Sequence, residues 1–119
     1  MIIFAVLAAA LSTLAAAPPQ GGVYELESPA GRCQLLLQDT AAPLPETNLS
    51  SDDAAGFAMA MPGCPAALSE TAFWRFAGGA GELSLFDTGG ETLATVRAGS
   101  GRGWAGATTQ GDALTLTRR

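Results

Sequence analysis

The chain has 119 residues, a net charge of −5 and no histidine. All six positive charges are arginines that form no cluster, which argues against nucleic acid and anionic membrane surfaces as partners. Histidine is the commonest general base and zinc ligand, so its absence disfavours catalysis and a metal site. We therefore expect a protein that is not an enzyme and uses no small-molecule cofactor.

Residues 1–17 form an uncharged apolar run that ends in small residues and is followed by two prolines. The run is shorter than the roughly 20 residues of a membrane-spanning helix. It is typical of the hydrophobic region and cleavage zone of a signal peptide, although the usual positive charges before that region are missing. Cleavage after Ala15 or after Ala17 fits the small residues there. The prediction is export to the periplasm; an uncleaved anchor and a mis-assigned start are the alternatives.

Residues 18–22 predict a short extended arm with nothing to pack against. Beyond the arm, apolar residues alternate with polar ones in runs that glycine-rich turns separate. The clearest runs contain Tyr24 and Leu26; Cys33, Leu35 and Leu37; Trp74 and Phe76; Leu83 and Leu85; and Leu114 and Leu116. Each predicts a strand with one face on a core and one on water.

Weaker strands near residues 56–61, 92–97 and 102–108 raise the expected total to about eight, which is typical of a β-sandwich or a closed barrel. Between the strands, residues 39–55 are rich in proline and turn formers and predict a long loop. Residues 64–68 predict a single helical turn with Pro65 at its first position.

Trp74 and Trp104 are the largest apolar side chains, and we expect both to lie in the core. The alternative is a lined pocket for an apolar ligand. An eight-stranded barrel is just wide enough to be filled by side chains or to hold one small ligand. Two tryptophans, four phenylalanines outside the leader and many leucines favour a filled interior.

Cys33 and Cys64 are the only cysteines. Two cysteines in an exported chain most simply form a disulfide, which for a loop of this length stabilises the fold by about 3–4 kcal/mol. Two reduced, buried thiols are the alternative. A zinc site is disfavoured because two cysteines without histidine leave tetrahedral coordination incomplete.

Residues 101–106 fit the dinucleotide-binding pattern G-x-G-x-x-G. That motif functions when it follows a strand and opens a helix whose N-terminus receives the pyrophosphate. Here the glycines pass from a turn into an expected strand, so nucleotide binding is not predicted.

Several motifs occur in an order that resembles the bacterial alkaline protease inhibitor family, which includes outer-membrane lipoproteins of the same fold. The opening Gly22–Leu26 resembles G-x-W-x-L, with Tyr24 in place of the usual tryptophan, and Cys33–Leu37 resembles C-x-L-x-L. The remaining matches are Gly63-Cys64-Pro65 with Trp74 about ten residues beyond, Gly81–Asp87 followed by Gly90, Trp104, and Leu114–Arg118.

The resemblance implies an all-β fold, a small eight-stranded antiparallel up-and-down barrel over residues 23–119 with a Cys33–Cys64 disulfide. Tyr24, Trp74 and Trp104 would be its core anchors, and the tyrosine hydroxyl would need a partner.

The resemblance also implies a protein partner, a secreted zinc metalloprotease of the serralysin type. The inhibitory arm would occupy the protease cleft, and its first residue would reach the catalytic zinc; its residues are Ala16, Ala17, Pro18, Pro19 and Gln20. A proline-rich arm is stiff and loses less entropy on binding. We expect a monomeric inhibitor. The alternatives are a non-inhibitory, envelope-associated barrel of the same family and a lipocalin-like carrier of a small apolar ligand.

Overall fold

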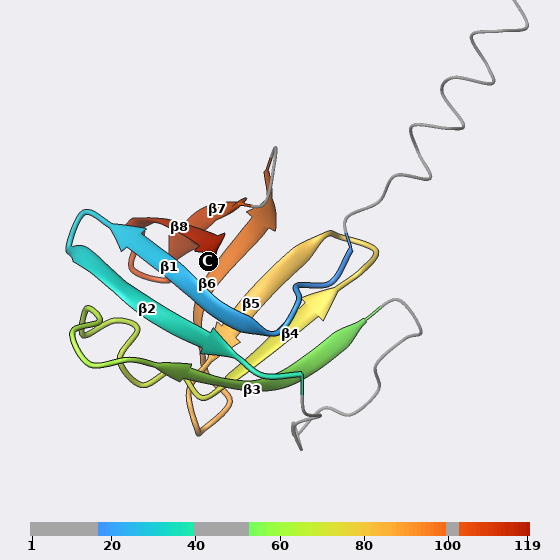
Figure 1. The fold of residues 1–119 in the computed structure, drawn as a ribbon, viewed down its shortest axis with the longest axis horizontal. Coiled ribbons are helices and arrows are strands. Elements are labelled where there is room, and N and C mark those ends of the chain that lie inside the picture. The colour runs from blue at the N-terminus through green and yellow to red at the C-terminus, as the bar shows by residue number, and fades with distance from the viewer. Residues whose placement is uncertain (1–16, 40–52, 100–102) are drawn as a thin grey trace, which may run out of the picture.

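The computed structural model describes residues 17–39, 53–99 and 103–119 (Figure 1). Most of the expected signal peptide, together with Ala16, lies outside this part of the chain. The same holds for residues 40–52 of the expected long loop and for the first two positions of the glycine motif at 101–106.

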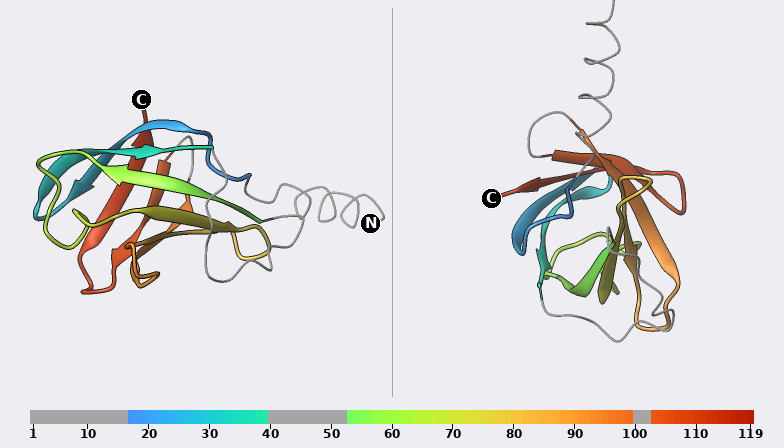
Figure 2. Two further views of the ribbon diagram at one scale, coloured as in Figure 1. Left: turned by 90° about the horizontal axis from the view of Figure 1, so that it is seen from below. Right: turned by 90° about the vertical axis from the view of Figure 1, so that its right-hand side faces the viewer.

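Within the described residues, eight strands form one closed barrel (Figures 1 and 2). They are β1 (Gly22–Ser28), β2 (Gly31–Leu37), β3 (Ala54–Ala60), β4 (Phe73–Ala77), β5 (Glu82–Phe86), β6 (Thr92–Ala98), β7 (Gly103–Thr108) and β8 (Ala113–Arg118). Each strand pairs antiparallel with the next, and β8 pairs with β1. This confirms the expected eight-stranded, up-and-down barrel.

The interior is filled by the inward-facing residue of each alternating pair. The fully buried side chains include Tyr24 and Leu26 of β1, Leu83 and Leu85 of β5, and Leu116 of β8. Closure depends on contacts between the two chain ends, because Leu26 lies directly opposite Leu116 in the pairing of β1 with β8. Such a closed sheet has no exposed edge strand.

The phenylalanines do not all contribute to this interior. Of the four outside the leader, only Phe76 is fully buried. Phe57, Phe73 and Phe86 are half-buried and alternate with inward-facing neighbours, so they lie on the outer face of β3, β4 and β5. The Phe57 and Phe73 rings pack with their centroids 5.7 Å apart. The interior is therefore filled mainly by leucines and by Tyr24, Trp74 and Trp104.

One end of the barrel, which we call the closed end, is covered by the connection between β3 and β4. Leu68 of this connection is fully buried, and its carbonyl accepts a hydrogen bond of 2.6 Å from the Thr71 hydroxyl. A disulfide joins Cys64 of the connection to Cys33 of β2, as expected. The predicted helical turn at 64–68 is a hydrogen-bonded turn, closed by the Leu68 amide and the Pro65 carbonyl at 2.9 Å. The described residues contain no helix that is long and apolar enough to cross a membrane.

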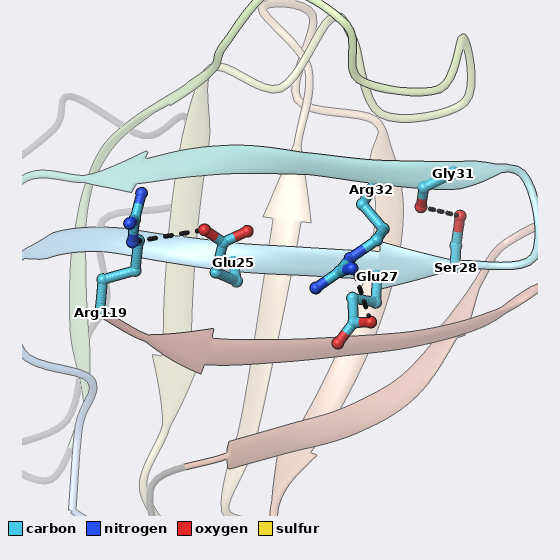
Figure 3. A network of polar contacts seen from close by, with 6 residues as sticks. All are labelled: Glu25, Glu27, Ser28, Gly31, Arg32 and Arg119. Atoms are coloured by element: carbon cyan, nitrogen blue, oxygen red, sulfur yellow. Dashed lines mark hydrogen bonds and ion pairs between the residues drawn. The ribbon is translucent and has the colours of Figure 1, made fainter.

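The outer face of β1 carries charged residues that form ion pairs with neighbouring strands. Glu27 pairs with Arg32 of β2 and Glu25 pairs with Arg119, both at 3.3 Å (Figure 3). These side chains are partly or largely exposed, so the pairs contribute little to stability. Their importance here is that they neutralise two arginines of the surface.

Candidate functional site at the arm end of the barrel

The up-and-down topology brings residues from both ends of the sequence to one end of the barrel, which we call the arm end. Strands β1 and β7 begin there, whereas β8 ends there, because alternate strands run in opposite directions. Tyr24 near the start of β1, Trp104 near the start of β7 and Arg118 at the end of β8 therefore lie close together. The segment that precedes β1 reaches the same end (Figure 1).

The base of the expected arm is packed against the barrel, which corrects the prediction that it has nothing to pack against. Pro19 is buried, while Ala17, Pro18 and Gln20 are exposed. Pro19 lines a pocket together with Trp104 and Arg118, which are distant in sequence, so local composition gave no sign of its position. Among the described residues, the exposed Ala17 and Pro18 precede this buried position.

Two hydrogen bonds hold the backbone of the arm base. The Tyr24 hydroxyl donates to the Gln20 carbonyl at 2.6 Å, and Nη2 of Arg118 donates to the Gly21 carbonyl at 3.0 Å. The hydroxyl of Tyr24 thus has the hydrogen-bond partner that a buried tyrosine needs. These bonds join the arm to the first and last strands of the barrel.

The environment of Tyr24 changes its acidity. Burial raises the pKa of the Tyr24 hydroxyl above its ordinary value of 10.0, because the charged phenolate is poorly solvated there. The positive charge of Arg118 acts in the opposite direction, and the negative charge of Asp39 adds to the increase. Tyr24 is therefore a neutral hydrogen-bond donor near neutral pH.

A pocket of about 320 Å³ opens between the arm and the barrel. It is lined by Pro18, Pro19, Gln20, Tyr24, Trp104 and Arg118. The ring of Trp104 packs edge-on against Phe76, with centroids 5.8 Å apart, so it is supported from the interior. The pocket combines aromatic and proline surfaces with one guanidinium group.

The other residues singled out in the sequence lie elsewhere. Trp74 is buried inside the barrel, where its Nε1 donates to the Gln38 carbonyl at 3.0 Å. The Cys33–Cys64 disulfide belongs to the closed end. In the G-x-G-x-x-G pattern, the last two glycines, Gly103 and Gly106, lie within β7. Glycines inside a strand do not provide the helix N-terminus that this pattern needs to bind a pyrophosphate.

Arg118 also lines this site, and its sequence context predicted no functional role for it. Its guanidinium lies beside Gly22, where an added Cβ would stand 3.2 Å from Nη2. Gly22 also has a φ of 142°, which side-chain-bearing residues rarely adopt. The Gly21-Gly22 pair, where β1 begins, was therefore a signal for a close approach of another side chain.

No protein-family model matches this chain, and no curated protein matches its sequence.

Proposed function

We propose that this protein is a periplasmic inhibitor of secreted zinc metalloproteases of the serralysin type, without enzymatic activity of its own. The observation that supports the proposal best is the arrangement of the arm. Its base at Pro19–Gly21 is held on the barrel, whereas Ala17 and Pro18 are exposed in front of it. A fixed base with a short projecting tip is suited to enter the narrow cleft of a protease.

The proposed mechanism is occupation of the cleft by the tip of the arm. The first residue reaches the catalytic zinc of the protease and displaces the water that would attack the substrate. Because the base is already ordered by Tyr24 and Arg118, little conformational freedom is lost there on binding. Proline in the tip resists cleavage by the enzyme that it blocks.

The length of the tip depends on where the leader is removed. Cleavage after Ala15 leaves Ala16, Ala17 and Pro18 in front of the buried Pro19, and three extended residues span about 10 Å. Cleavage after Ala17 leaves Pro18 alone, which spans about 3.5 Å. We therefore propose that the inhibitory form begins at Ala16.

The experiment is a titration of a serralysin-type protease with purified, oxidised protein, following hydrolysis of a peptide substrate. Three forms are compared, beginning at Ala16, at Pro18 and at Pro19. The form that begins at Ala16 should inhibit stoichiometrically. Loss of the tip should weaken inhibition by about thirtyfold or more, the effect of removing a hot-spot contact.

Two controls separate the tip from the rest of the protein. Glu70→Gln changes an exposed residue in the connection at the closed end and should inhibit like the parent. A form with one extra residue before Ala16 keeps the tip but displaces its α-amino group, and it should inhibit poorly. If no form inhibits although the barrel is folded, the inhibitor proposal is wrong, and a non-inhibitory envelope role becomes the leading hypothesis.

A further inference from the structure

We infer that the pocket at the arm end is a binding site for a small carboxylate that carries one aromatic or apolar group. This site shares Pro18 with the tip that makes the proposed protease contact, but its other walls belong to the arm base and the barrel. The inference depends on the shape, lining and charge of the pocket alone.

The size and the walls of the pocket fit a compact apolar group. Its volume of about 320 Å³ is at the lower end of the range for small-molecule sites, about 300–1,000 Å³. Rings of Tyr24 and Trp104 line it from the barrel, and rings of Pro18 and Pro19 line it from the arm. Because Tyr24 is only 1% exposed, Trp104 and the two prolines are the residues that can contact another ring or a short aliphatic chain.

The charge in the pocket comes from Arg118, which differs from the other arginines of the described part of the chain. Each of the others forms an ion pair with a carboxylate; the pairs are Arg32–Glu27, Arg75–Asp53, Arg97–Glu82 and Arg119–Glu25. Figure 3 shows the first and last of these pairs. Arg118 has no carboxylate partner among the described residues and donates only to the Gly21 carbonyl.

A guanidinium without an ion-pair partner, in a partly enclosed pocket with mixed polar and apolar walls, favours an anion, and the negative charge of Asp39 near Tyr24 opposes this attraction only in part. Nε of Arg118 is also buried and has no hydrogen-bond partner among the described residues, so the group is incompletely satisfied. Arginine and carboxylate form hydrogen bonds that are shorter and stronger than those between neutral groups. A carboxylate is favoured over a phosphate because the pocket contains one positive charge and the protein carries a net charge of −5.

Two sources could provide this chemistry, a free aromatic acid and the C-terminal carboxylate of a peptide. Benzoate represents the first and N-acetylphenylalanine the second. Benzamide and N-acetylphenylalanine amide are the neutral counterparts of nearly the same shape. The probes are titrated into the mature, oxidised protein while the indole N–H signals of Trp74 and Trp104 are followed by NMR.

The expected result is that at least one acid shifts the Trp104 signal and binds about tenfold or more tightly than its amide, as expected for a charged hydrogen bond. Arg118→Gln should remove this preference. Arg119→Gln changes the net charge by the same amount but removes the ion pair with Glu25, so this variant should still prefer the acid over the amide. Preference for benzoate over N-acetylphenylalanine would identify free acids as the ligand class, and the reverse would identify peptide termini.

The inference is overturned if neither acid binds, if acids and amides bind equally, or if the response comes from Trp74 instead of Trp104. If Arg118→Gln fails to fold, the comparison of acid with amide on the parent protein still decides the question. Because no protease is present in this assay, its outcome is independent of the inhibitor proposal.

Discussion

Gly56 and Trp74 lie directly opposite each other in the pairing of β3 with β4, and the missing side chain at Gly56 makes room for the indole of Trp74. A Cβ atom at position 56 would stand 2.6 Å from Nε1 of Trp74 and would also overlap the carbonyl oxygen of Gln38. That carbonyl accepts the hydrogen bond from Trp74. The glycine is therefore required for the packing of one of the largest residues in the core.

Replacing Gly56 by alanine should destabilise the barrel. The added methyl group forces either the indole or the backbone to move, and such overpacking typically costs about 1–3 kcal/mol. The free energy of unfolding in urea measures the effect. Gly79→Ala is the matched control, because a Cβ at that exposed turn position meets no atom within 4 Å. Equal stability of the two variants would show that Gly56 is not needed for the packing of Trp74.

The Cys33–Cys64 disulfide should stabilise the fold mainly by restricting the unfolded chain. The two cysteines are separated by 31 residues, and closing a loop of this length contributes about 3–4 kcal/mol. Changing both cysteines to serine should lower the free energy of unfolding by about this amount. The measurement is urea unfolding of the variant beside the oxidised parent. A loss below about 1 kcal/mol would mean that the connection at the closed end is held by Leu68 and its hydrogen bonds instead.

The rings of Phe57 and Phe73 should stabilise each other on the outer face of the barrel. Aromatic pairs contribute about 0.5–1.5 kcal/mol beyond the area that they bury. A double-mutant cycle with Phe57→Leu and Phe73→Leu should therefore give a coupling energy in this range. Phe57 with Leu114, which lies inside the barrel on β8, is the control pair. Its two changes should be additive within about 0.5 kcal/mol. Coupling of equal size in both pairs would contradict a specific interaction of the rings.

The strands could be predicted because the pattern that indicates each of them lies within a few consecutive residues. The alternation of Leu83 and Leu85 with polar residues is enough to indicate a half-buried strand. Alternation alone did not distinguish a sandwich from a barrel, because both bury one face of each strand. What distinguishes them is the pairing of β1 with β8, for example Leu26 opposite Leu116, and this contact joins the two ends of the sequence. The resemblance to the inhibitor family supplied that non-local information.

The site was less predictable for the same reason. The position of Phe73 on the outer face could have been found from the sequence, since it precedes the inward-facing Trp74. The place of Pro19 beside Trp104 and Arg118 could not, because those residues are distant in sequence. Nor could local patterns show that Arg118 would donate to the Gly21 carbonyl, 97 residues away. The arm end is built from contacts between the first, seventh and eighth strands.

The acidity of Tyr24 should make stability depend on pH in the alkaline range. Its pKa is raised in the folded protein, so the folded state holds the proton more tightly than the unfolded state, whose value is near 10.0. The contribution is fully present below pH 10 and is lost as the pH rises through the folded pKa. Tyr24 is the only tyrosine of the chain, so the ultraviolet absorbance of its phenolate reports this group alone. A midpoint at or below that of the urea-unfolded chain would contradict the effect of burial.

The hydroxyl of Tyr24 should also matter for inhibition, because it fixes the arm base. In Tyr24→Phe the Gln20 carbonyl loses its donor, and a hydrogen bond of this kind contributes about 0.5–1.5 kcal/mol. The arm base would then be ordered partly at the moment of binding, so the affinity for the protease should fall by about two- to tenfold.

Thr109→Ala, an exposed change in the turn between β7 and β8 at the opposite end, serves as the control. The affinities come from the same titration of peptide hydrolysis, and circular dichroism verifies that the barrel is intact. If a folded Tyr24→Phe protein bound the protease with unchanged affinity, the arm base would not need to be ordered before binding. The hydrogen bond from Tyr24 would then not be part of the inhibitory mechanism.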